Sequence, residues 1–262
     1  MTLVHPAYAQ MRQVTPSVAV VLAENPSVMS LEGTNTWILR APGHDECVVV
    51  DPGPLDEAHL ARIAQVPVAL TLISHRHYDH TEGAQRFAEL TGNPVRAVSP
   101  THRHGGGRGL EDGEIVEAAG LRIRVVATPG HTADSLSFVL DDDRSVLTAD
   151  TILGRGTTVL DDTDGDLGDY LGSLRRLLDL SAGYTMLPGH GPEHPDLAPI
   201  ARAYLAHREE RLEQVRSALQ VLGDDATARS VVERVYADVD RSLWGAAEKS
   251  VNVQLDYLRS LT

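Results

Sequence analysis

The chain has 262 residues, of which 23 are Lys or Arg and 37 are Asp or Glu, so its formal net charge is −14. Hydrophobic residues make up 42%, enough for a sizeable core, and this excludes wholesale disorder. The acidic balance disfavours sequence-blind binding to nucleic acid, and a single cysteine, Cys47, excludes an internal disulfide and a cysteine-rich zinc site. The apolar run 18–23 is too short to span a membrane, and no secretion signal is recognisable, so we expect a soluble cytoplasmic protein.

The first hundred residues predict strands followed by alternating helices and strands. Short β-rich runs bounded by Gly, Pro and Asn predict strands at Thr15–Leu22, Thr36–Arg40, Cys47–Asp51, Val68–Ile73 and Val95–Val98. Helical spacing of apolar residues predicts helices at Leu55–Gln65 and Thr81–Leu90.

The rest of the chain divides into a second strand-rich stretch and a helical tail. Four strands are expected at Glu114–Glu117, Leu121–Val126, Ser135–Leu140 and Ser145–Leu147, then a helix at Asp166–Leu180 and a strand at Tyr184–Leu187. Further helices are expected at Pro199–Leu222, Ala226–Val239 and Ser242–Leu261. We therefore predict two domains, 1–195 and 196–262. The tail is too short to bury a large core alone, so its apolar residues should pack on each other and on the first domain: Val231, Val235, Leu243, Val251, Leu255 and Leu258.

The most informative segment runs from His75 to His80 and holds three histidines and an aspartate: His75, His77, Asp79 and His80. It follows a predicted strand directly, so we expect these side chains on a loop at the carboxyl end of that strand, where α/β folds place their active sites. Imidazole nitrogen and carboxylate oxygen are the usual ligands of zinc and also bind iron and manganese. The alternative is a solvated histidine-rich loop.

Three further polar residues follow strands in the same way. His131 lies in a turn after 121–126, Asp150 ends the strand near 145–147, and His190 follows 184–187. Each alone is more simply a structural or surface residue, but together they can meet the first segment at one edge of a sheet sandwich.

This set of residues, in this order, resembles the metallo-β-lactamase fold superfamily over residues 15–195. The family motif usually begins with Thr, where this chain has Ser74. The resemblance implies an α/β fold, an αββα sandwich with a two-metal site at one edge. A finer resemblance, to the lactamase-β-like protein 2 group, rests on four parts of the chain. These are residues 31–37, residues 50–53, residues 187–192 together with the helix that contains His207–Glu210, and the helical tail. It implies that the tail is a small winged-helix-like unit.

The resemblance also implies the role of each ligand. His75, His77 and His131 would bind one metal ion, Asp79, His80 and His190 would bind the second, and Asp150 would bridge the two. Asp51 matches a carboxylate that orients a ligand histidine, although it also reads as a turn-forming residue before Pro52. We expect two divalent ions, with zinc first and iron or manganese as alternatives.

Such a site predicts a hydrolase. Two close metal ions can hold a bridging hydroxide as nucleophile, and Asp79 can accept and pass on its proton. True class B β-lactamases generally have Cys or Ser where Asp150 stands, so β-lactam hydrolysis is disfavoured. Animal members of the lactamase-β-like protein 2 group are endoribonucleases, which favours single-stranded RNA as substrate. The alternatives are a glyoxalase II-like thioester hydrolase and a scaffold without catalysis.

An RNA substrate requires a locally positive channel in this acidic protein. Arg155 and Arg108 follow predicted strand ends and are the candidate substrate-binding residues. A flexible loop carries His102 and His104, and it reads either as solvated or as a lid. The sequence predicts a small-molecule or RNA substrate, no membrane and no obligate protein partner.

Overall fold

The computed structural model describes residues 7–160, 163–180, 183–223 and 225–261. Its first half forms a six-stranded sheet whose spatial order follows the chain: β1 (Met11–Gln13), β2 (Val18–Leu22), β3 (Asn35–Leu39), β4 (Cys47–Val50), β5 (Val68–Leu72) and β6 (Val95–Arg96). The first four strands pair antiparallel, whereas β4, β5 and β6 are parallel. The strands β4 and β5 therefore end at the same edge of the sheet.

A second sheet of five strands runs in the order β11-β10-β9-β8-β7. Its members are β7 (Ile115–Ala118), β8 (Leu121–Ala127), β9 (Leu136–Leu140), β10 (Ser145–Ala149) and β11 (Thr185–Pro188). Neighbours pair antiparallel except β10 and β11, which are parallel. Because these two strands run the same way, the segments that follow them also lie side by side.

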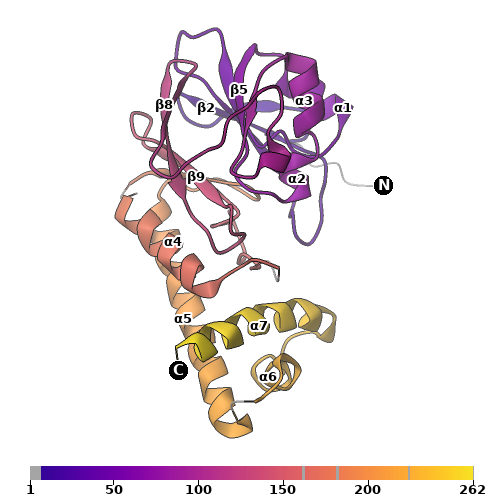
Figure 1. Cartoon of the computed structure of the whole chain (residues 1–262), viewed down its shortest axis with the longest axis vertical. Coiled ribbons are helices and arrows are strands. Elements are labelled where there is room, and N and C mark those ends of the chain that lie inside the picture. The colour runs from indigo at the N-terminus through magenta and orange to yellow at the C-terminus, as the bar shows by residue number, and fades with distance from the viewer. Residues whose placement is uncertain (1–6, 161–162, 181–182, 224, 262) are drawn as a thin grey trace.

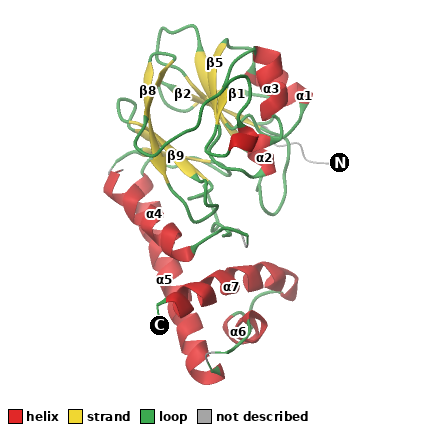
Figure 2. Ribbon diagram, in the orientation of Figure 1, coloured by secondary structure: helices red, strands yellow, loops and turns green. Residues whose placement is uncertain are grey.

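Helices cover the outer faces of both sheets, as Figures 1 and 2 show. Beside the first sheet lie α1 (Glu57–Ile63), α2 (Tyr78–Thr81) and α3 (Ala84–Thr91), and beside the second lie α4 (Leu167–Leu180) and α5 (Leu197–Leu222). One apolar cluster joins α1 and α3 to the first sheet, a second fills the space between the sheets, and a third joins the second sheet to α4 and α5. The layers are therefore helix, sheet, sheet and helix.

The tail continues the third cluster rather than forming a core of its own. The helix α5 runs away from the sandwich and meets α6 (Ala228–Val235) and α7 (Trp244–Ser260) (Figure 1). Five of the six predicted tail residues belong to the cluster or pack against it. The sixth prediction was wrong, because Leu243 ends a short 3₁₀ turn (Arg241–Leu243) and is 49% exposed. No helix in the described ranges combines the length and apolarity needed to cross a bilayer.

Two local features differ from the prediction. The strand β1 was missed, because it has only three residues, all of them exposed, and two of the three are polar. The helix expected from Thr81 is divided into α2 and α3, and α2 already begins at Tyr78. Asp79 and His80 therefore lie on a helical turn and not on a loop. The division falls at Gly83, where a side chain would collide with Leu60 and the carbonyl of Pro54.

Candidate metal centre

Seven histidine and aspartate side chains meet where strands of both sheets end. They come from the segment after β5, from α2, from the β8–β9 connection and from the ends of β10 and β11: His75, His77, Asp79, His80, His131, Asp150 and His190. Two groups of these side chains are each compact enough to hold a metal ion, and Asp150 contacts both groups.

The first group consists of three imidazoles and one carboxylate. Nδ1 of His77 lies 3.1 Å from Nε2 of His75 and 3.0 Å from Nε2 of His131. Oδ2 of Asp150 lies 4.0 Å from Nε2 of His75 and 3.7 Å from Nε2 of His131. The four ligand atoms lie within 4.8 Å of one another, so one ion can contact all of them.

The second group contains Asp79, His80 and His190. Nε2 of His190 lies 3.2 Å from Oδ2 of Asp79 and 3.3 Å from Nε2 of His80. Asp150 also contacts this group, since its Oδ2 lies 3.2 Å from Nε2 of His190 and its Oδ1 lies 3.6 Å from Nε2 of His80. The carboxylate of Asp150 thus lies between both groups.

Hydrogen bonds on the far side of two imidazoles fix which nitrogen faces inward without a proton. The hydroxyl of Ser74 donates to Asp51 at 2.6 Å, so it must accept from Nδ1 of His75 at 2.9 Å. Nδ1 of His131 donates to the carbonyl of Val159 at 2.7 Å. The Nε2 atoms of His75 and His131 therefore carry no proton, and both point their lone pairs at Nδ1 of His77. That nitrogen carries at most one proton, so it can donate a hydrogen bond to only one of the two. A cation between the three rings satisfies all of them, so the donor set fits a metal ion.

Asp51 holds two of the candidate ligands in place. Its Oδ2 accepts from Nδ1 of His80 at 2.9 Å and from Ser74, which in turn accepts from His75. Its Oδ1 accepts from the backbone amide of Ser74 at 2.8 Å, and the residue is 1% exposed. Of the two interpretations open from the sequence, the geometry favours orientation of the histidines.

The carboxylates and imidazoles of the cluster shift one another's pKa values. Burial lowers the pKa of His131 to about 4 and that of His75 well below its usual value, so both rings are neutral, as metal ligands must be. Burial also lowers the pKa of His190, but the nearby carboxylates of Asp150 and Asp79 outweigh burial and raise that pKa to about 11. Burial raises the pKa of Asp79, yet the charges of His80 and His190 outweigh it and lower that pKa to about 2. Oδ1 of Asp150 is buried and has no hydrogen-bond partner among the described residues, which again fits a cation.

Sequence reasoning missed the residues that support Asp79. The hydroxyl of Thr34 donates to Oδ2 of Asp79 at 3.2 Å and accepts from Asn25 at 2.9 Å. The stretch Gly33–Asn35 has the composition of a tight hairpin turn, but a longer segment joins β2 to β3. This segment packs on the His190 loop through a backbone bridge between Thr34 and His190. At Gly33, a side chain would lie 2.0 Å from the carbonyl of Ala23.

The two candidate substrate-binding arginines lie in different places. Arg108 lies apart from the cluster, because the backbone of His104 pairs with Val95 and the chain then returns along β6. It lines a hollow with Glu46 and Ala69, at the opposite end of β4 and β5 from His75. Arg108 therefore does not lie at the edge that holds the candidate ligands, because the loop after β6 reverses.

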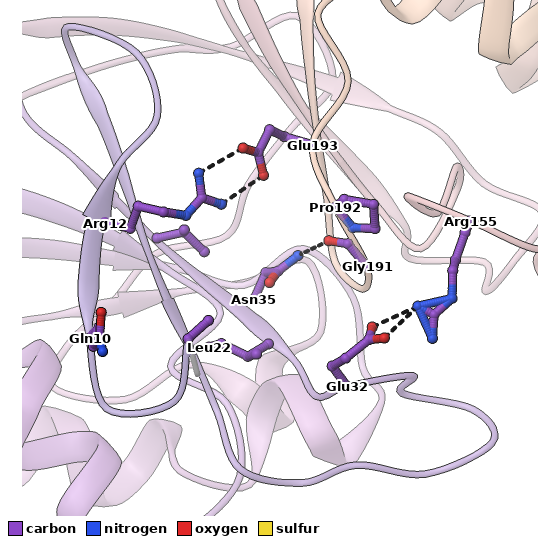
Figure 3. Close-up of a pocket in the computed structure, with 11 residues that line it drawn as sticks. Gln10, Arg12, Leu22, Glu32, Asn35, Arg155, Gly191, Pro192 and Glu193 are labelled. Carbon is purple, nitrogen blue, oxygen red and sulfur yellow. Dashed lines mark hydrogen bonds and ion pairs between the residues drawn. The ribbon is translucent and has the colours of Figure 1, made fainter. Parts of the chain in front are cut away.

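Arg155 lies close to the His190 loop, on the rim of a pocket of about 470 Å³ (Figure 3). Its guanidinium is paired with Glu32 at 2.6 Å, and a second pair, Arg12 with Glu193 at 2.7 Å, lies across the same pocket. Apolar side chains form part of the wall: Ala7, Val20, Leu22 and Pro192. The amide of Asn35 connects this pocket to the His190 loop by donating to the carbonyls of Pro188 and Gly191.

Comparison with known proteins agrees with this architecture. The family model of the metallo-beta-lactamase superfamily matches residues 29–190, and that of the beta-lactamase associated winged helix domain matches residues 227–260. The expected αββα fold with a winged-helix-like unit after it is therefore confirmed, and the described part of that unit contains helices only.

Individual relatives cover most of the chain. An atrochrysone carboxyl ACP thioesterase of Aspergillus fumigatus is 32% identical, over 85% of this chain and 74% of the relative's own length. A beta-lactamase-like protein 2 homolog of Caenorhabditis elegans is 29% identical, over 94% of this chain and 85% of the relative's own length. A beta-lactamase domain protein from Burkholderia ambifaria has the same fold, with a TM-score of 0.81, 22% identity, and coverage of 98% of this chain and 90% of its own.

Proposed function

The chain belongs to the metallo-beta-lactamase superfamily and is a hydrolase of that fold, and from this premise we propose that it cleaves thioesters with two bound divalent metal ions. His75, His77 and His131 would hold one ion, Asp79, His80 and His190 the other, and Asp150 both. The observation that carries the proposal is the contact of Asp150 with both histidine groups. The set of imidazoles and carboxylates suits zinc, and also iron or manganese.

The protein's own residues define the reaction geometry. When bound, the two ions supply Lewis-acid polarisation of the carbonyl and an activated water. Asp79 is the most accessible of the three carboxylates of the cluster, with 19% of its side chain exposed against 10% for Asp150 and 2% for Asp51. Its carboxylate is held by the hydroxyl of Thr34, so it can accept the proton of the attacking water. The rigid histidines keep the reacting groups aligned.

The arginines near the cluster support a thioester better than a phosphodiester. Arg155 is paired with Glu32, and Arg76 with Asp164 at 2.8 Å, so neither offers an uncompensated charge to a phosphate chain. An RNA strand would have to displace these carboxylates from an acidic protein. A thiolate, in contrast, is a good leaving group that needs no such contacts, because a thiol has a pKa near 8.5.

The relatives point the same way. Several carry the name atrochrysone carboxyl ACP thioesterase. The pocket beside the His190 loop has apolar walls suited to the non-reacting part of an acyl thioester (Figure 3). The resemblance to the lactamase-β-like protein 2 group predicts cleavage of single-stranded RNA instead.

A substrate screen tests the proposal. Metal-loaded protein is assayed with S-lactoylglutathione, an acyl-pantetheine thioester, single-stranded RNA and a β-lactam, and thiol release is expected from at least one thioester. The matched control is Asp79→Ala, which separates turnover at this site from a contaminating hydrolase. Cleavage of RNA without hydrolysis of either thioester would reverse the order of the two candidates, and inactivity on all four would contradict hydrolysis of these classes.

A further inference from the structure

The long helix α5 reaches back to the metal-binding edge through one buried arginine. Arg208 belongs to the His207–Glu210 segment and is 7% exposed. Its guanidinium donates a hydrogen bond to the carbonyl of Thr158 and lies 5.0 Å from the centre of the Tyr170 ring. A buried arginine is costly unless it is hydrogen-bonded, so a contact of this kind has a structural or functional reason.

Thr158 passes this contact on to two candidate metal ligands. Its hydroxyl donates to the backbone carbonyl of Asp150 at 2.9 Å. The carbonyl of the next residue, Val159, accepts from Nδ1 of His131 at 2.7 Å. A single bond to Arg208 therefore restrains the segment that contacts both Asp150 and His131, which are two of the four members of the first group.

The segment between Asp150 and Val159 contains no helix or strand, and side chains of α4 and α5 help to hold it in position. The hydroxyl of Tyr170 on α4 donates to the carbonyl of Thr151 at 2.7 Å. The hydroxyl of Tyr204 on α5 accepts from the amide of Leu153 at 3.1 Å. Ala149, just before Asp150, has a φ of +45°, a strained conformation that persists only where its surroundings enforce it.

We propose that Arg208 is a positioning residue for the first metal-binding group. Acting through Thr158, it sets where Asp150 lies and keeps the Val159 carbonyl on His131, so α5 couples the carboxyl-terminal helices to the metal edge. The inference rests on the proposed function, because it assumes that this group holds an ion. Loss of a hydrogen bond behind a metal ligand typically weakens metal binding about 10- to 100-fold.

The test is a chelator competition on cobalt-loaded full-length protein, followed by the visible absorption of bound cobalt. Arg208→Met keeps the bulk over Tyr170 and removes the donor, and Thr158→Val removes the hydroxyl while keeping the shape. Arg208→Lys and Thr158→Ser should restore binding in part, because each retains a donor. Arg216→Met is the matched control, since Arg216 lies on the same helix and is paired with exposed Glu213.

The expected result is selective. In Arg208→Met and Thr158→Val, cobalt is released about 10- to 100-fold more readily and its absorption changes, while the unfolding temperature of the metal-free protein matches the control. If Arg208→Met does not fold, Thr158→Val alone decides. Cobalt affinity within twofold of the wild type in every folded variant overturns the positioning role. A wild-type protein that binds no cobalt overturns the proposed function itself, so the two failures are distinguishable.

Discussion

The metal-binding edge and the carboxyl-terminal helices are held together by opposite kinds of interaction. At the edge, buried polar groups face one another, and hydrogen bonds such as those of Asp51 and Ser74 fix their orientation. In the tail, Val231, Val251 and Leu255 pack in an apolar cluster shared with α4 and α5. Removal of a side chain at the edge should therefore lower activity and leave the protein folded. Removal of an apolar side chain in the tail should lower stability and leave the metal-binding residues in place.

The two regions meet where Arg208 and Tyr204 of α5 hydrogen-bond the segment between Asp150 and Val159. Apart from these contacts, we expect the regions to respond separately to substitution. Substitutions at Asp79, Leu255 and Arg155 test whether the two regions respond separately.

Asp79→Ala should have the largest effect on activity. It removes a candidate ligand of the second group together with the proton acceptor, so hydrolysis should fall by about two orders of magnitude or more. The fold should survive, because the side chain is partly exposed on a short helix. Steady-state kinetics and thermal unfolding measure both, with exposed Gln85→Ala as the control. Near-normal turnover in Asp79→Ala would place the chemistry elsewhere.

Leu255→Ala should have the reverse effect. Leu255 is 2% exposed within the third cluster, so its truncation should lower the free energy of unfolding by about 2–5 kcal/mol through lost burial and a cavity. Metal content of the folded protein should not change. Denaturant unfolding and metal analysis provide the measurements, and Leu261→Ala, at a 61% exposed position, is the control. A loss of metal with no loss of stability would contradict the separation of the two regions.

Arg155→Gln should have the smallest effect if the substrate is a thioester. Arg155 is half exposed and already paired with Glu32, so the catalytic constants should change by no more than about threefold, the scale of an exposed ion pair. If the substrate is RNA, KM should rise and the dependence of activity on salt should become shallower, because a phosphate contact is lost. Activity measured across a salt series distinguishes the two results.

The edge was largely predictable from the sequence because its information is local. Four of the seven candidate ligands lie within His75–His80, and the others directly follow recognisable strands. Parallel pairing of β10 with β11 then brings Asp150 and His190 together. Sequence reasoning failed at the reversal between His104 and Arg108, because a run of three glycines marks a turn there but does not say where the chain goes next.

The connection between the regions was not predictable in the same way. Arg208 and Thr158 are 50 positions apart, and an arginine on an amphipathic helix ordinarily faces solvent. Only the packing of α5 on α4 turns that side chain inward over Tyr170. The division of 1–195 from 196–262 remains a prediction, although α5 does begin at Leu197, just past the expected boundary.

We propose that the side chains at the strand ends form a two-metal site. Elemental analysis of protein produced with zinc, iron and manganese in the medium measures the occupancy of this site, with His190→Ala as the paired variant. We expect about two metal equivalents in the wild type, the number that a dinuclear hydrolase site requires, and a loss of about one of them in the variant. Less than about half an equivalent in the wild type would contradict it.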